Sequence, residues 1–229
     1  MKRFYKTVTV APEAGGFRVM LDQRGIRTAR GQPQVAPTEA LAQALAAEWD
    51  AQGEEIDPQR FFFRDLADYA IDVVAADRSG VIRGLLPYAD TDTLCYRAEP
   101  DEPLHARQLD VWEPLLAAAE HRWDVHFERI GGIIHRAQPP ATLARMEAAL
   151  AARSDFALAA VQTLASLAAS LVIALAATEP DADIEALWDA ANLEEDWQAE
   201  LWGKDAEAME RRERRLTAFA LAARFARLA

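Results

Sequence analysis

The chain has 229 residues, 51% of them hydrophobic, which is enough to bury one large core or two smaller ones without metals or disulfides. Its formal net charge of −12 argues against nucleic-acid binding, because phosphate contacts need a concentrated basic surface. The single cysteine, Cys95, fits a reducing compartment and gives no cysteine framework for a metal, so we expect a cytoplasmic protein with no metal and no cofactor.

The first 35 residues alternate between apolar and polar side chains, with a Gly15-Gly16 pair and a second turn at residues 22–25. This pattern predicts antiparallel strands joined by hairpin turns. Thr38 then starts an amphipathic helix that ends near Gly53, and a second helix follows Asp57-Pro58. No export signal or transit peptide is visible ahead of these elements.

A shorter helix is expected from Ser79 to Tyr88, and Thr93–Arg97 is apolar and β-prone enough to be the last strand of this half. The segment Glu99–Pro103, with two prolines and three acids, is the best candidate boundary. Beyond it, helical periodicity continues to the end of the chain. Helices are expected in a stripe around Leu109–Ala119 and at about Ala141–Ala152, Asp155–Ala177, Ile184–Trp202 and Ala206–Leu228. The fold class is therefore predicted as α+β, with a mixed domain of antiparallel strands and helices in residues 1–98 and an all-α domain in residues 99–229.

The uncharged stretch Phe156–Ala177 is long enough to span a bilayer. Alanine dominates it, however, and Gln and Ser/Thr side chains recur on neighbouring turns, which suits a helix buried in a bundle. We therefore expect a core helix and no stable membrane insertion.

The sequence carries no recognisable catalytic signature. It has no phosphate-binding glycine loop, no nucleophile elbow and no HExxH pattern, and its four histidines are not spaced as metal ligands. The arginine cluster at residues 211–215 is interleaved with glutamates, which favours a salt-bridged helix face over a docking patch.

One constellation stands out in the helix that begins at Ile184. Its apolar line passes through Leu187, Trp188 and Ala191, and the next positions on that line are polar. These positions are Glu194, Glu195 and Gln198, followed by Leu201 and Trp202. Because an unpaired buried carboxylate costs several kcal/mol, the acids should meet an internal base or belong to a surface that serves a partner. The alternative is that the helix simply turns out of the core there.

Five segments in this order resemble the Atp12 family of chaperones for assembly of the catalytic F₁ sector of ATP synthase. They are KRFYKTVTV (2–10), GFRVMLDQRGIRT (16–28), AEWDAQGEEIDP (47–58), LCYRAEPDEPLHARQLDVWEPLL (94–116) and LEEDWQAELWGKDAEAMERR (193–212). The resemblance covers the chain from end to end. It implies a bacterial member with a mixed N-terminal domain followed by an orthogonal helical bundle.

The resemblance also implies a function. Such a chaperone binds the free α subunit of the catalytic head, prevents its aggregation and is displaced by the β subunit. In the family an acidic position in the last third is important, so the expected partner-binding residues are Glu194, Glu195, Gln198 and Trp202. Trp49 and Asp50 match another family motif, but Trp49 fits the core stripe of its helix and is more simply structural. We expect a monomer.

The alternative function is a small soluble hydrolase that uses acidic residues and a histidine. It would require a deep pocket with convergent carboxylates of perturbed protonation.

Overall fold

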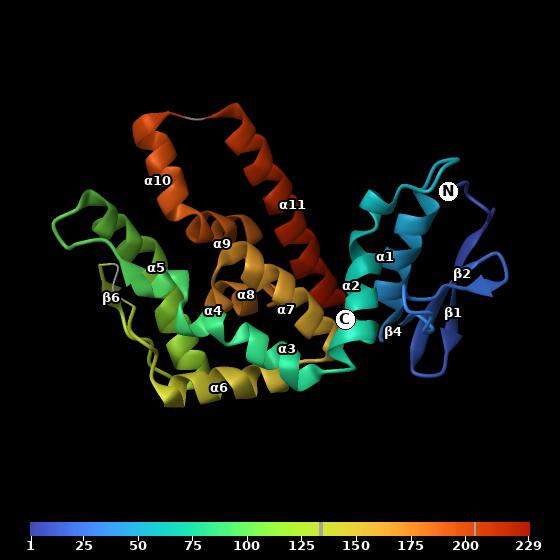
Figure 1. Ribbon diagram of the computed structural model, residues 1–229, viewed down its shortest axis with the longest axis horizontal. Coiled ribbons are helices and arrows are strands. Elements are labelled where there is room, and N and C mark those ends of the chain that lie inside the picture. The colour runs from blue at the N-terminus through green and yellow to red at the C-terminus, as the bar shows by residue number, and fades with distance from the viewer. Residues whose placement is uncertain (133–134, 204) are drawn as a thin grey trace. The chain divides into compact units, whose positions relative to one another are not determined.

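The computed structural model describes residues 1–132, 135–203 and 205–229, and it separates into two compact units. The N-terminal unit comprises Met1–Arg78 with Ser154–Ala160 and Arg224–Ala229, and the helical unit comprises Ser79–Arg153 with Val161–Ala223. A small antiparallel sheet with helices is followed by a helical region, so the α+β class is confirmed (Figure 1). The predicted domains, residues 1–98 and 99–229, stay a prediction.

The sheet of the N-terminal unit is built on a hairpin. Strand β1 (Val8–Glu13) pairs antiparallel with β2 (Gly16–Leu21), with Val10 opposite Val19. The short strands β3 (Arg24–Gly25) and β4 (Val35–Ala36) also pair antiparallel with β2. A Cβ at Gly16 would lie 2.0 Å from the carbonyl oxygen of Ala36, so only glycine lets β4 come this close to β2.

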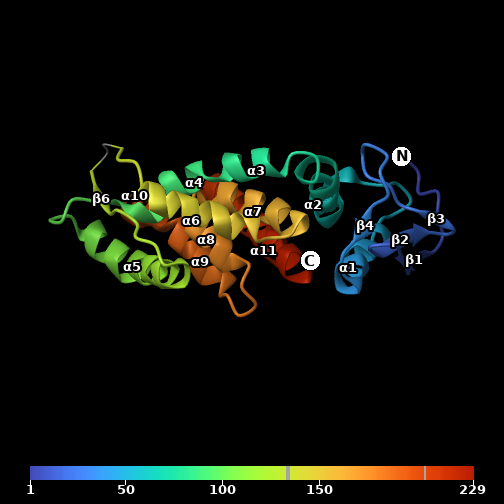
Figure 2. The ribbon, with the colours of Figure 1, turned by 90° about the horizontal axis from the view of Figure 1, so that it is seen from below.

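Helix α1 (Glu39–Asp50) packs against β1 and β2 (Figure 2), and the Oγ1 of Thr38 accepts a hydrogen bond from Leu41 N at 3.1 Å, as predicted for its N-cap. A 3₁₀ turn, η1 (Pro58–Arg60), leads to α2 (Phe62–Tyr69), which continues into the π-helical turn η2 (Ala70–Val74). The carboxylate of Glu48 on α1 accepts from Phe63 N at 2.6 Å and Arg64 N at 2.9 Å, which caps the start of α2.

The remaining elements lie in the helical unit, except for Arg78, residues 155–160 and residues 224–228, which belong to the N-terminal unit. These elements are α3 (Arg78–Leu85), α4 (Pro87–Asp90), the 3₁₀ turn η3 (Thr93–Cys95), β5 (Tyr96–Arg97), α5 (Pro103–Trp123), β6 (Ile130–Gly131), α6 (Pro140–Ala151), α7 (Asp155–Ala168), α8 (Leu171–Ala177), α9 (Ile184–Ala191), α10 (Leu193–Trp202) and α11 (Ala206–Leu228). Its core includes the fully buried rings of Trp112 and Trp188, and Trp112 Nε1 donates to Ala190 O at 2.8 Å. That bond joins α5 to α9.

The prediction that Thr93–Arg97 is the last strand of the N-terminal half was wrong. Only Tyr96 and Arg97 are extended, and they pair parallel with β6 inside the helical unit. Leu94 and Cys95 are fully buried in η3, so the apolar run reflects burial in a helical core rather than a place in the sheet.

The single helix predicted for Asp155–Ala177 is two helices. Ala169 adopts a left-handed φ of 49°, and Ser170 caps α8 by accepting from Ile173 N at 3.0 Å. Both helices are largely buried, as expected for core helices. Among the described residues, no helix combines the length and the apolar character that crossing a membrane requires.

Candidate functional site

The helix predicted from Ile184 to Trp202 is also interrupted, and the interruption defines the candidate site. Asn192 lies between α9 and α10 with φ −109° and ψ 14°, and its Nδ2 donates to Trp188 O at 2.7 Å. The apolar line of α9 therefore does not continue along α10. Glu194 and Glu195 follow this break and are both exposed.

The four residues predicted to bind a partner share the outward face of α10. At roughly 100° per residue, Glu194, Glu195, Gln198 and Trp202 fall within an arc of about 120°. All four are exposed, and Trp202 is 84% exposed. The opposite side of α10 carries Leu193, which is 4% exposed. The structure thus brings the predicted residues together on one surface.

Two further apolar residues extend this surface beyond the four residues predicted to bind a partner. Leu201 and Met209 are 62% and 53% exposed, and together with Trp202 they lie at the facing ends of α10 and α11. We call Glu194, Glu195, Gln198, Leu201, Trp202 and Met209 the α10 surface.

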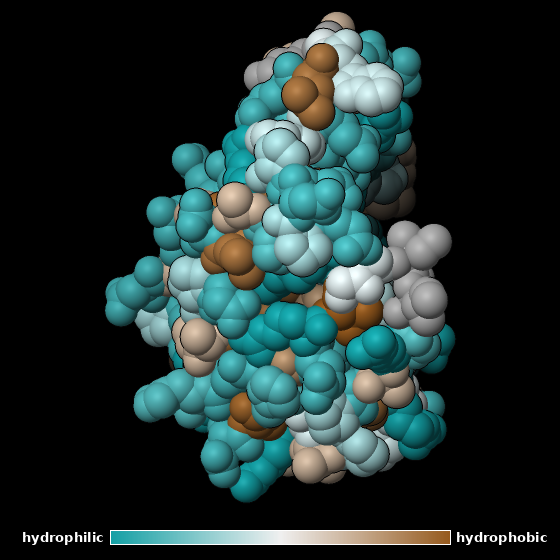
Figure 3. Space-filling view, turned by 90° about the vertical axis from the view of Figure 1, so that its left-hand side faces the viewer, coloured by the Kyte–Doolittle hydropathy of each residue, from teal (hydrophilic) through white to brown (hydrophobic). Residues whose placement is uncertain are grey.

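Figure 3 shows a largely hydrophilic face with isolated hydrophobic side chains, one of them at the upper end, where α10 lies. Apolar side chains that are exposed at a helix end add no hydrophobic stabilisation to the fold. A surface that presents Trp and Leu among carboxylates is therefore typical of a polar interface with an aromatic anchor.

Polar contacts hold α10 to its neighbours. Arg107 of α5 binds Glu200 through two nitrogens at 2.7 and 3.0 Å, and its guanidinium lies 5.6 Å from the ring centre of Trp197. On the other side, Arg212 of α11 donates to Asp196 at 2.6 Å and to Asp189 at 2.7 Å. These two carboxylates raise the pKa of Arg212, against the opposing effect of its burial. The contacts fix the inward face of α10 and leave its outward face available.

The predicted ion pairing of the arginine cluster is confirmed in part. Arg214 pairs with Glu210 one turn earlier at 2.6 Å. Arg212 instead uses the aspartates of α9 and α10, and Arg215 donates to Leu167 O at 2.9 Å. Arg212 and Arg215 therefore anchor α11 to other helices of the helical unit, and Arg214 is paired along its own helix.

A groove of about 700 Å³ runs between α5, α9, α10 and α11. Glu195 lines it together with apolar side chains such as Val111, Leu193 and Leu216. Glu195 makes no hydrogen bond or ion pair with any described residue, whereas Glu194 accepts from Gln108 Nε2 at 2.7 Å. Glu195 is consequently the acid of the pair whose charge is available to a partner.

The negative charge of the chain is concentrated in the helical unit. This unit holds 24 acidic and 13 basic residues, so it accounts for a charge of −11 out of −12. Residues 179–200 alone carry nine acids and no Lys or Arg. We call them the acidic segment. Such a field favours a partner surface with basic side chains.

Contacts between histidines and carboxylates lie at the surface. His126 Nδ1 is 3.1 Å from Glu120 Oε1, and its side chain is 68% exposed. His135 lies 3.9 Å from Asp90 and is also exposed. Among the described residues, no group of three or more His, Cys, Asp or Glu side chains is placed to hold a metal ion. These pairs are surface interactions of small energetic value.

Residues 2–120 match the family model described as ATP12 chaperone protein. The crystal structure of Atp12 from Paracoccus denitrificans is similar at 36% identity, with a TM-score of 0.93 over 99% of this chain and 97% of that chain. A point mutant of P. denitrificans Atp12p gives a TM-score of 0.94 at the same identity and coverage. The Atu1473 protein from Agrobacterium tumefaciens is 41% identical, with a TM-score of 0.91 over 98% of this chain and 84% of that chain. The match to the family model ends before α10, while the structural matches cover nearly the whole chain.

Proposed function

The chain belongs to the ATP12 chaperone family, and we propose that it binds the free α subunit of the ATP synthase catalytic head and hands it to the β subunit. The general function, that of an ATP synthase assembly chaperone, follows from membership of the family. Because the family is one of chaperones, we propose a non-enzymatic role rather than the hydrolase alternative.

The side chains on the outward face of α10 are the reason for choosing this surface. There an unpaired carboxylate, Glu195, lies about two helical turns from the exposed ring of Trp202. A charge and an aromatic ring within one helical face supply both orientation and apolar contact area to a partner. We propose that this α10 surface contacts the α subunit.

The mechanism is protection of an apolar surface. A lone α subunit exposes the face that β covers later, and an exposed apolar patch of that kind promotes aggregation. A chaperone interface that is partly polar can cover the patch and still be exchanged for the larger and more apolar interface with β. Exchange of this kind is driven by the stability of the α–β contact, so it requires no nucleotide hydrolysis by the chaperone.

We further propose that the chaperone acts as a cytoplasmic monomer. The strongly acidic helical unit supports this, since like-charged copies repel one another at the surface that the client would occupy. Sedimentation of the purified chain at several concentrations tests the monomer, and a concentration-dependent dimer would contradict it.

Co-purification tests the central proposal. The tagged chain is mixed with isolated α subunit, and the retained α is measured with and without an excess of β. We expect α to be retained alone and released when β is added. Retention that does not change with β would contradict the transfer, and a chain that ignores free α would contradict the choice of client. Retention of β alone would indicate that the client has been misassigned.

A further inference from the structure

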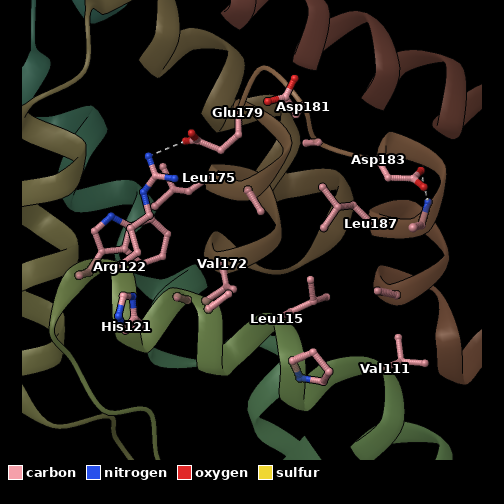
Figure 4. A pocket seen from close by; sticks show the side chains of 18 of the residues that line it. Val111, Leu115, His121, Arg122, Val172, Leu175, Glu179, Asp181, Asp183 and Leu187 are labelled. Atoms are coloured by element: carbon pink, nitrogen blue, oxygen red, sulfur yellow. Dashed lines mark hydrogen bonds and ion pairs between the residues drawn. The ribbon is translucent and has the colours of Figure 1, made fainter.

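A second groove in the helical unit is lined by α5, α8 and α9 (Figure 4). It has a volume of about 770 Å³ and a mainly apolar lining. Val172 and Leu175 of α8 and Leu187 of α9 form its buried part, while Val111 and Leu115 of α5 are partly exposed. A groove of this size and lining can accept several apolar side chains from a partner.

The rim of the groove is acidic. Asp110, Asp181 and Asp183 line it and are exposed, and none of the three forms an ion pair among the described residues. Among the described residues, one arginine lines the groove, and this residue, Arg122, is held by Glu179 at 2.9 Å, as the dashed line in Figure 4 marks. The charge that the rim offers to a partner is therefore negative.

The lining also restricts the backbone conformation of an occupant. The groove is formed by three helices and the turn at residues 179–183, so it provides no strand edge for an extended peptide. An extended segment buried there would lose water from its N–H and C=O groups without gaining new partners. A helix satisfies these groups internally, and an amphipathic helix places apolar side chains on one side.

We propose that this groove binds an amphipathic helix of the client, with an apolar stripe against Val111, Leu115 and Leu187 and with Lys or Arg side chains against Asp110, Asp181 and Asp183. The proposal rests on the chaperone function and names the chemistry of the client segment. The groove shares Val111, Ala186 and Ala190 with the groove beside Glu195, so it is continuous with the lining next to the α10 surface. One client can therefore contact both.

Two neighbouring alanines of α5 provide a matched pair of variants. Ala117 and Ala118 are both exposed, but only Ala118 lines the groove. Arginine has a high helix propensity, so Ala118→Arg should leave α5 folded while it occupies part of the groove and adds one positive charge beside the three aspartates of the rim. Ala117→Arg adds the same side chain and charge outside the groove. Circular dichroism and thermal unfolding of both variants verify the fold.

The binding probe is a synthetic peptide of about 16 residues, long enough to form a helix. Its Leu residues are spaced alternately three and four positions apart to form one stripe, and Lys residues lie on both sides of that stripe. A second peptide carries Glu in place of Lys, and a third has the same composition as the first in scrambled order. Binding to the full chain is measured by fluorescence anisotropy at low and high salt. We expect the Lys peptide to bind best, to weaken with salt, and to lose about tenfold or more in affinity with Ala118→Arg but not with Ala117→Arg.

Equal binding of the Glu or scrambled peptide would overturn the proposal, and so would equal affinity of the Ala118→Arg variant and the unmodified chain. The two proposals fail separately. If the chain retains free α subunit but binds no helical peptide, the groove is misassigned and the chaperone function stands. If peptide binding depends on Ala118 but α is not retained, the assignment of the groove as a helix-binding site stands and the α subunit is not the client.

Discussion

The Nε2 of Gln108, a side chain with no exposed surface, donates to Oε1 of Glu194 at 2.7 Å. The Oε1 of the same amide accepts from Ala98 N at 2.8 Å. Gln108 thus connects the segment after β5, helix α5 and the first turn of α10 through one buried amide. Of the two neighbouring acids, Glu194 is committed to this internal contact and Glu195 is not.

Gln108→Leu should destabilise the chain by about 1–3 kcal/mol, because it leaves the N–H of Ala98 and the carboxylate of Glu194 without their partner. It should also weaken capture of the α subunit, since the first turn of α10 loses a positioning contact. Urea unfolding and the co-purification assay measure the two effects. Gln43→Leu, at an exposed position of α1, is the control and should change stability by less than about 0.5 kcal/mol.

Glu195→Lys should reduce retention of the α subunit by about tenfold or more, because it places a like charge against the basic partner surface that we infer. Lysine near the start of α10 also interacts unfavourably with the helix dipole, at a cost of about 0.3–1 kcal/mol. Glu195→Gln avoids that cost and should give an intermediate loss of retention. Glu147→Lys makes the same charge change on the exposed face of α6 and should retain α normally. Normal retention by Glu195→Lys would remove Glu195 from the site.

Trp202→Ala should leave stability within about 0.5 kcal/mol of the unmodified chain, because the ring is 84% exposed and contributes little to the core. If Trp202 anchors the client, its loss should cost about 2 kcal/mol or more of binding free energy, a factor of about 30 in affinity. A titration of α subunit against the immobilised chain measures this factor. Phe4→Ala removes another exposed aromatic side chain, 55% exposed in the N-terminal unit, and serves as the control.

Much of the architecture could be predicted from periodicity, but the helix breaks could not. The hairpin around Gly15-Gly16 and the Thr38 cap are local signals, and both were found. Ala169 carries no signal for a break, because alanine is a strong helix former, and Asn192 carries only a weak one, because Asn is a poorer helix former that often lies at helix ends. Ala169 is left-handed in the structure, and its carbonyl accepts from Thr93 N at 3.2 Å, a contact 76 positions away in the chain. Tertiary contacts of this kind have no local sequence signature.

The acids of the candidate site illustrate the same limit. Their helical spacing correctly placed Glu194, Glu195, Gln198 and Trp202 on one face. The sequence left open whether these acids meet an internal partner, serve a surface or follow a helix that turns out of the core, because it does not show that Asn192 ends the apolar line of α9. Other acids look exposed in the sequence but are buried in the structure. Asp68 and Asp72 look like solvated helix residues in the sequence, yet both are buried, and Asp72 accepts from Thr28 Oγ1 at 2.8 Å.

The buried carboxyl of Asp92 should make stability depend on pH. Burial raises its pKa to about 6, although Leu94 N and Val172 N donate to its two oxygens at 3.1 and 3.0 Å and favour the ionised form. Because the folded pKa lies above the usual value of 3.8, the folded state holds this proton more tightly than the unfolded state. Protonated Asp92 therefore contributes fully to the free energy of unfolding at low pH, and this contribution is lost as the pH rises from about 4 to 6. The change is about 3 kcal/mol for a shift of about two pKa units.

Asp92→Asn isolates this contribution from the carboxylates with lowered pKa, such as Glu113 and Glu120, which act in the opposite direction. At pH 4 the protonated carboxyl still presents an oxygen to each of the two N–H groups, whereas the amide presents its NH2 group to one of them, so the variant should be less stable by about 1–3 kcal/mol. Its deficit should shrink or reverse at pH 7. Urea unfolding at both pH values measures the difference, and a deficit that does not change with pH would show that Asp92 does not titrate in this range.

Ala169→Gly should stabilise the chain, because Ala169 has φ 49°, a region in which a Cβ costs about 1–2 kcal/mol. Glycine removes that cost, and the larger entropy of the unfolded glycine chain offsets about 0.4–1 kcal/mol of the gain. The expected net increase in unfolding free energy is about 0.5–1 kcal/mol. Ala148→Gly, at an exposed position in the interior of α6, makes the same chemical change where the backbone is helical and should lose about 1 kcal/mol. The two variants should therefore move the urea midpoint in opposite directions. A loss of stability in both would mean that the left-handed turn between α7 and α8 imposes no cost on alanine.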